Sequence, residues 1–305
     1  MYSGTPAQLS SMKLKSAGDL LSFLDRGKVD WAIGFYVLPP DRSSPVVSRV
    51  EPIISTAKSR VIPLLQPRPS DENYSRFASG QYSETVLRQY LKPQGLLQGV
   101  GELALYYPEL QSVTFDSPAM QTVFQVVNEL KGIVMIHPSN VDRGGRPTGL
   151  AEIEPSIRKY PDAIFLFHGT SEVFNLVVQL MSKYPNVYFT FDANNWIFAG
   201  GGGEGGNPLA LADNAESFLT KVNRIVSDRM VEQGLIKLTP LLQQYPDRIF
   251  WGTDLGASWN FEESVTDVVI SLSRQLIGRL PADIQEKYAY QNALRVFGRF
   301  LTPNP

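Results

Sequence analysis

The chain has 305 residues, of which 43% are hydrophobic and 19% charged, and its formal net charge is −2. This length and balance predict one large α/β domain over residues 1–305, with ample apolar material for a core. Because Lys and Arg are scattered, a nucleic-acid partner is not expected, since it would require a basic surface. The chain has no cysteine, which excludes a disulfide framework, a zinc finger and a thiol nucleophile.

The sequence says little about the cellular compartment. No apolar run approaches the ~18–20 residues of a membrane span, so no membrane partner is expected. The absence of cysteine fits a cytoplasmic protein, which we favour, and also a periplasmic protein that needs no disulfides. If Met1 is the natural start, no signal peptide is visible. The expected partner is a small-molecule substrate, and a homo-oligomer is compatible with the sequence.

The first clear element is a helix from about Ser16 to Arg26. Short apolar runs then recur along the chain, each followed by a turn. Because these runs are nearly continuously hydrophobic, they are typical of parallel strands that are covered on both faces. The seven predicted strands are Trp31–Phe35, Val61–Leu65, Leu96–Val100, Ile133–Ile136, Ile164–Phe167, Val187–Phe191 and Ile249–Trp251.

Amphipathic stretches between the apolar runs predict helices. Several of them end at a Tyr-Pro pair, because proline cannot continue a helix. The predicted helices include Asp19–Arg26, Ser83–Tyr90, Pro118–Leu130, Ile153–Tyr160, Val173–Tyr184 and Glu262–Leu276. A strand and helix that repeat every roughly 25–35 residues indicate βα units. The sequence therefore predicts a TIM-type (β/α) barrel. Such a barrel has eight strands, so strand one is missing before the first helix.

A glycine-rich run at Ala199–Gly206 opens a predicted insertion around residues 199–232. This run is typical either of a disordered surface insertion or of a mobile lid over an active site. It lacks the pattern of a phosphate-binding loop and the context of a dinucleotide-binding fingerprint. The chain also lacks the G-x-S-x-G motif of serine hydrolases.

The two histidines of the chain, His137 and His168, each come directly after a predicted strand. In a barrel of this class, catalytic groups project from the carboxyl ends of the strands. Imidazole nitrogens and carboxylate oxygens are the ligands that zinc accepts when no thiolate is present. A single histidine there is more often a hydrogen-bonded residue that closes the core. Two on consecutive units, with carboxylates at equivalent places, favour a metal or catalytic site.

Three other strand ends carry candidate polar side chains. Glu102 and Asp254 are candidate site carboxylates, although a carboxylate there can also cap the next helix or pair with an arginine. Asp254 follows Gly252-Thr253, small residues that let the backbone pass close to a site. Arg68 is a candidate for binding a substrate carboxylate, with a surface ion pair as the alternative. Asp192 is interpreted as ordinary turn chemistry.

A series of short motifs in this order resembles the amidohydrolase-2 branch of the amidohydrolase superfamily. The match runs from about Trp31 to near the end of the chain. The motifs are Gly99–Glu102 (GVGE), Ile136–Ser139 (IHPS), Phe167–Gly169 (FHG), Tyr184–Val187 (YPNV), Asp247–Asp254 (DRIFWGTD) and Asn292–Phe297 (NALRVF).

The resemblance implies a barrel with one or two divalent metal ions at its mouth, with Zn²⁺ favoured. When the missing strand is counted as strand one, His137 would be the metal ligand after strand five. Glu102 matches a strand-four glutamate of part of the family. Asp254 would be the strand-eight aspartate, which binds metal or takes a proton from water. His168 would be the strand-six histidine, either a ligand or the catalytic acid/base.

The sequence departs from the family at its first residues. The family opens with Asp-x-His-x-His on strand one, and Met1 stands where the second histidine would be, before Tyr2-Ser3. We expect either a chain begun too late or a genuine loss of two metal ligands.

The expected function is a metal-dependent hydrolase that acts on a small amide, lactone or ester through an activated water. One alternative is a metal-dependent, non-oxidative decarboxylase of the same branch, because fold and ligands are shared. The other is a non-catalytic barrel without metal.

Overall fold

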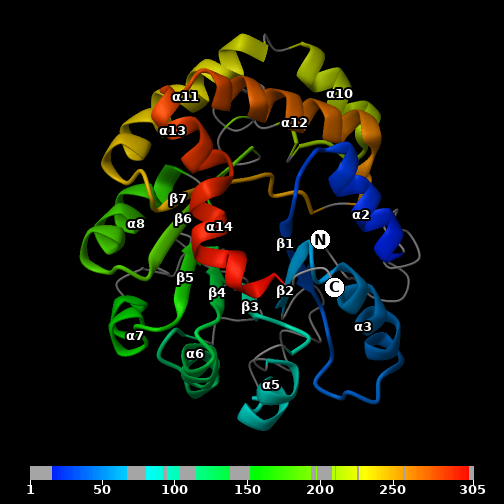
Figure 1. Cartoon of the computed structure of the whole chain (residues 1–305), viewed down its shortest axis with the longest axis vertical. Helices are drawn as coiled ribbons and strands as arrows, with labels where there is room; N and C mark the ends of the chain where they lie inside the picture. The colour runs from blue at the N-terminus through cyan, green and yellow to red at the C-terminus, as the bar shows by residue number, and fades with distance from the viewer. Residues whose placement is uncertain are drawn as a thin grey trace. The chain divides into compact units, whose positions relative to one another are not determined.

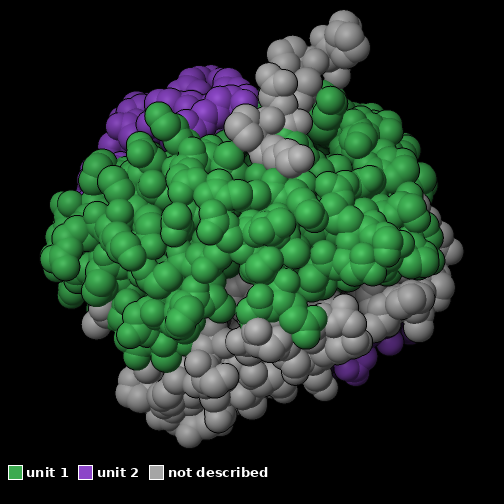
Figure 2. All heavy atoms as spheres, turned by 90° about the horizontal axis from the view of Figure 1, so that it is seen from below, with its two compact units in different colours: residues 1–25, 29–188, 300–305 green, residues 26–28, 189–299 purple. Residues whose placement is uncertain are grey.

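The computed structural model describes most of the chain. The described residues are 16–66, 80–91, 95–103, 114–137, 152–169, 171–193, 197, 208–209, 211–224, 227–256 and 258–301. The chain divides into two compact units, shown in Figure 2. The first unit comprises residues 1–25, 29–188 and 300–305, and the second comprises residues 26–28 and 189–299. The single domain over residues 1–305 stays a prediction, and residues 1–15 lie outside the described ranges.

The first unit contains five parallel strands that alternate with helices. In Figure 1 the helices of this unit lie around the outer side of its strands. The order along the chain is α2 (Ala17–Arg26), β1 (Ala32–Tyr36), α3 (Pro45–Ala57), β2 (Val61–Leu65), α5 (Glu84–Tyr90), β3 (Gly99–Leu103), α6 (Pro118–Glu129), β4 (Ile133–Ile136), α7 (Glu154–Lys159), β5 (Ile164–Phe167) and α8 (Ser171–Lys183).

The second unit holds most of β6 (Val187–Asp192), which pairs in parallel with β7 (Ile249–Gly252) from Phe189↔Ile249 to Asp192↔Gly252. Its other elements, among the described residues, are helical. They are α10 (Ala215–Asn223), α11 (Ser227–Gln244), η5 (Ser258–Phe261), α12 (Glu263–Gly278), α13 (Ala282–Glu286), the π-helical turn η6 (Lys287–Gln291), α14 (Asn292–Phe297) and η7 (Gly298–Phe300).

The predicted seven parallel strands are confirmed, and their order in the sheet follows the sequence. Three of them, β2, β4 and β5, have the predicted bounds, because every residue in them is apolar and buried. One strand was predicted with wrong bounds. Strand β3 begins at Gly99, three residues later than the predicted Leu96, so Glu102 lies inside the strand and not after it.

The predicted insertion around residues 199–232 is helical in its later part. Helix α10 occupies residues 215–223, and α11 begins at Ser227. The side chain of Asn214 caps α10 by accepting a hydrogen bond from the backbone N–H of Ser217 at 2.8 Å. The glycine run itself, Ala199–Gly206, lies outside the described residues.

Aromatic and amide side chains join the helices of the first unit to its strands. The ring of Phe124 on α6 lies 5.7 Å from that of Phe165 on β5 and 6.0 Å from that of Tyr160. Asn186 donates from Nδ2 to the carbonyl oxygens of Tyr160 and Ala163 at 3.2 and 3.1 Å. These contacts hold β5 in place before the point where His168 follows it. Among the described helices, none has the length and apolarity needed to cross a membrane.

Candidate metal centre

His137 and His168 occupy equivalent positions in the first unit. Each is the first residue after its strand, β4 and β5 respectively. Each backbone N–H donates to the carbonyl of the last residue of the neighbouring strand. His137 donates to Leu103 of β3 at 3.0 Å, and His168 donates to Ile136 of β4 at 3.1 Å. The two rings meet edge to face, with centroids 4.7 Å apart and planes at 83°. His168 is buried, with 2% of its surface exposed.

Glu102 reaches the same place through an irregularity in β3. Val100 pairs with Val134 and Leu103 with Ile136, so Gly101 and Glu102 together face a single residue of β4, Met135. Such a bulge changes the direction in which a strand side chain points. A Cβ on Gly101 would lie 2.6 Å from the Cβ of Met135, and the φ of Gly101 is +157°. Only glycine allows this close approach.

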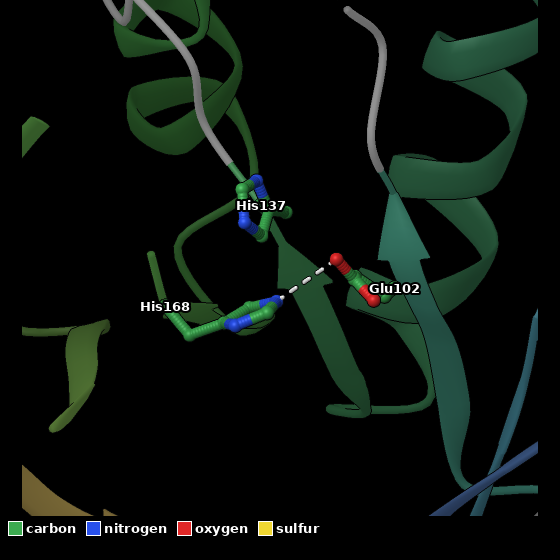
Figure 3. A group of neighbouring side chains, drawn as sticks. All are labelled: Glu102, His137 and His168. Carbon is green, nitrogen blue, oxygen red and sulfur yellow. Dashed lines mark ion pairs between the residues drawn. The ribbon is translucent and has the colours of Figure 1, made fainter. Parts of the chain in front are cut away.

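Glu102, His137 and His168 converge on one small volume (Figure 3). Their candidate ligand atoms all lie within 4.8 Å of one another. Oε1 of Glu102 is 3.2 Å from Nε2 of His168, and Glu102 is only 9% exposed. Two ligand atoms of a tetrahedral zinc are about 3.4 Å apart, given bond lengths near 2.1 Å. The donor set and its spacing therefore fit a divalent metal after small side-chain rotations.

Asp254 lies in the second unit, two residues after β7 ends, and its side chain is exposed. Its φ is +54°, in the left-handed region that non-glycine residues adopt infrequently. Aspartate tolerates this conformation better than most residues, and such positions are enriched at functional sites. Arg68, the predicted binder of a substrate carboxylate, lies outside the described residues.

Asp192, interpreted from the sequence as ordinary turn chemistry, is the last residue of β6 and only 2% exposed. In the same unit, the buried hydroxyl of Tyr288 donates to the carbonyl of Phe191 at 2.6 Å. Burial, and then the charge of Asp192, raise the pKa of Tyr288. In the sequence, Asp192 is the first polar residue after the apolar run Val187–Phe191, the same kind of position as those of His137 and His168.

Another motif residue has a structural task. Asn292, which opens the NALRVF motif, is buried and donates from Nδ2 to the carbonyls of Pro246 and Ile249 at 2.7 and 3.1 Å. It thereby attaches the start of α14 to the start of β7. This hydrogen bonding accounts for the asparagine without any role in chemistry.

No family model and no curated protein sequence matches the chain. Solved structures do. A probable 2-pyrone-4,6-dicarboxylic acid hydrolase from Acinetobacter baumannii is 11% identical, with 93% of this chain and 89% of that chain covered and a TM-score of 0.54. An amidohydrolase from Burkholderia multivorans with bound Zn is 12% identical, with 93% of this chain and 88% of that chain covered and a TM-score of 0.52. A TIM-barrel protein from Bordetella bronchiseptica is 12% identical, with 92% of this chain and 82% of that chain covered and a TM-score of 0.52. The chain therefore has the TIM-type (β/α) fold of these structures, one of which is an amidohydrolase, as the repeat of strands and helices in its sequence predicted.

Proposed function

We propose that the protein is a metal-dependent hydrolase that acts on a small amide, lactone or ester. The observation that carries this proposal is the convergence of Glu102, His137 and His168 from three successive strands. Imidazole and carboxylate groups, without any thiolate, are ligands that suit Zn²⁺. The Burkholderia multivorans amidohydrolase of similar fold has bound Zn, which supports the same choice of ion here.

We assign the holding of the metal to His137 and Glu102, and the family resemblance implies Asp254 as a further ligand. When bound, such a metal supplies a Lewis acid and an activated water. The carboxylate of Glu102 offsets part of the cation's charge in a buried place, where an uncompensated charge would be costly. Asp254 accepts a proton from the attacking water, as the family resemblance implies.

His168 is the proposed acid/base. Its Nε2 lies 3.2 Å from Oε1 of Glu102. A protonated His168 polarises the substrate carbonyl or donates a proton to the leaving group. Arg68 is proposed to bind a carboxylate of the substrate, since a guanidinium pairs with a carboxylate through two parallel hydrogen bonds.

The test combines metal analysis with assays of bond cleavage. Purified protein is loaded with Zn²⁺, dialysed and analysed for bound metal, and is then assayed on small amides, lactones and esters and for CO₂ release from aromatic acids. Because the chain lacks the two histidines of the family's first motif, we expect weak metal binding, and any hydrolysis should be abolished by a chelator. Release of CO₂ without hydrolysis would favour a decarboxylase, and absence of bound metal would favour a non-catalytic barrel.

A matched pair of variants shows whether the proposed ligands are responsible. Glu102→Gln removes the charge and keeps the shape, so we expect metal affinity to fall by about tenfold or more. Glu84→Gln on α5 removes an exposed carboxylate and should leave metal affinity unchanged. Equal metal affinity in both variants would contradict the proposed site.

A further inference from the structure

Gln66 has the same place on β2 that the two histidines have on β4 and β5. It is the first residue after its strand, and its backbone N–H donates to the carbonyl of Tyr36, the last residue of β1, at 2.9 Å. The identical pattern orients His137 and His168. Gln66 is buried, with 2% of its surface exposed, which is unusual for a glutamine at a strand end.

The pairing of the strands places Gln66 on the same face of the sheet as His137. Leu65 pairs with Val100, and Val100 pairs with Val134, so Leu65 and Val134 share one face. Side chains alternate between faces along a strand. Gln66, one residue after Leu65, and His137, three residues after Val134, therefore both lie on the opposite face. Because Leu65 pairs with Val100, Gln66 lies beside the start of the bulge in β3, which contains Glu102.

The carboxamide oxygen of Gln66 is a buried acceptor. Within the described part of the chain, its Oε1 has no hydrogen-bond partner and almost no exposed surface. A buried polar atom left without a partner costs about 1–3 kcal/mol, and folded proteins contain few of them. Such an atom at a strand end, beside a candidate site, is poised to accept a hydrogen bond from a bound ligand.

We propose that Gln66 is a specificity-determining residue that accepts a hydrogen bond from the N–H group of an amide substrate. This inference rests on the proposed hydrolase function and narrows its substrate class. An amide that carries an N–H satisfies the buried oxygen, whereas an ester or a lactone offers no donor at the corresponding atom. A site built around a substrate hydrogen bond discriminates strongly against analogues that lack the donor.

The test uses three matched probes: acetanilide, N-methylacetanilide and phenyl acetate. They share the acyl and aryl groups, and only acetanilide has the N–H. With the Zn²⁺-loaded protein, we expect Gln66→Leu to raise KM for acetanilide about tenfold or more, with a smaller change in kcat. Turnover of the other two probes should not change. Gln98→Leu, which alters a glutamine just before β3, should behave as the unsubstituted protein. Equal losses on all three probes, or no loss on acetanilide, would overturn the inference.

Absence of hydrolysis of all three probes would count against the proposed function. The inference about Gln66 would then be tested by melting temperature, because a bound ligand raises the Tm. We expect acetanilide to raise the Tm of the unsubstituted protein and of Gln98→Leu, but not of Gln66→Leu. An equal shift in all three proteins, or no shift in any, would overturn it. Without ligand, Gln66→Leu should melt at or above the normal Tm, and a lower Tm would assign Gln66 a structural role instead.

Discussion

The carboxylate of Glu102 on β3 lies 3.2 Å from the imidazole of His168 after β5, although β4 runs between these two strands. The side chains meet because both extend from the sheet near the carboxyl end of β4, where His137 follows (Figure 3). The bulge at Gly101 brings Glu102 to this position. The strands β3, β4 and β5 therefore each position one side chain, Glu102, His137 and His168 respectively, in a single small volume.

Alanine variants of the two histidines should separate ligand from acid/base. We expect His137→Ala to lose bound Zn²⁺ and activity together, because it removes a ligand. His168→Ala should lower kcat by about a hundredfold or more while most of the metal remains bound, because it removes an acid/base group. Metal content and steady-state kinetics of the two variants check this. If His168→Ala loses its metal as fully as His137→Ala, His168 is a ligand.

The close approach of β3 and β4 predicts a strong effect of Gly101→Ala. The added Cβ would lie 2.6 Å from the Cβ of Met135 and 2.9 Å from its carbonyl oxygen. We expect a loss of about 2–3 kcal/mol in the free energy of unfolding, since overpacked sites cannot relax fully. Chemical denaturation measures this loss.

Gly278→Ala at the end of α12 is the matched control for that substitution. No heavy atom lies within 4 Å of its added Cβ, so the same change should be neutral or stabilise the protein by up to about 1 kcal/mol. If the two variants have the same free energy of unfolding, the contact of Gly101 with Met135 is not as tight as described.

Tyr36→Phe should stabilise the protein. The hydroxyl of Tyr36, on β1, is buried and has no hydrogen-bond partner among the described residues, and burial raises the pKa of this group. Removing a buried hydroxyl that makes no hydrogen bond relieves its desolvation penalty. We expect a gain of about 1 kcal/mol, measured by denaturant titration. A loss of stability would show that this hydroxyl makes a favourable interaction in solution.

Tyr90 should make the protein less stable at alkaline pH. Burial raises the pKa of Tyr90 from 10.0 to about 12, and its hydroxyl donates to the carbonyl of Pro39 at 2.7 Å. Between these two pH values the unfolded chain loses a proton that the folded protein keeps, so stability falls as pH rises. Below the unfolded pKa the contribution is fully present.

The comparison of Tyr90→Phe with the unsubstituted protein checks this pH dependence. Phenylalanine cannot ionise, so Tm should decrease less with rising pH in the variant. The decrease should not vanish, because burial also raises the pKa of Tyr36 and Tyr288. An unchanged dependence of Tm on pH would exclude Tyr90 as a contributor.

The sequence by itself determined the strands whose residues are uniformly apolar and the histidines that follow two of them. Ile133–Ile136 and Ile164–Phe167 match β4 and β5 residue for residue, because strand formation there depends on a local apolar run between turns. The class of fold followed from the repeat of these runs. His137 and His168 accordingly follow β4 and β5 directly, at the strand ends where the sequence predicted them.

Only the tertiary structure decided how the strands are aligned and what their end residues face. The start of β3 at Gly99 and the bulge after it depend on contact with Met135, a residue distant in sequence, which no local pattern encodes. The burial of Asp192 and of the oxygen of Gln66 likewise depends on neighbouring strands and helices. Local sequence determines where a strand can form, whereas register and burial result from long-range packing.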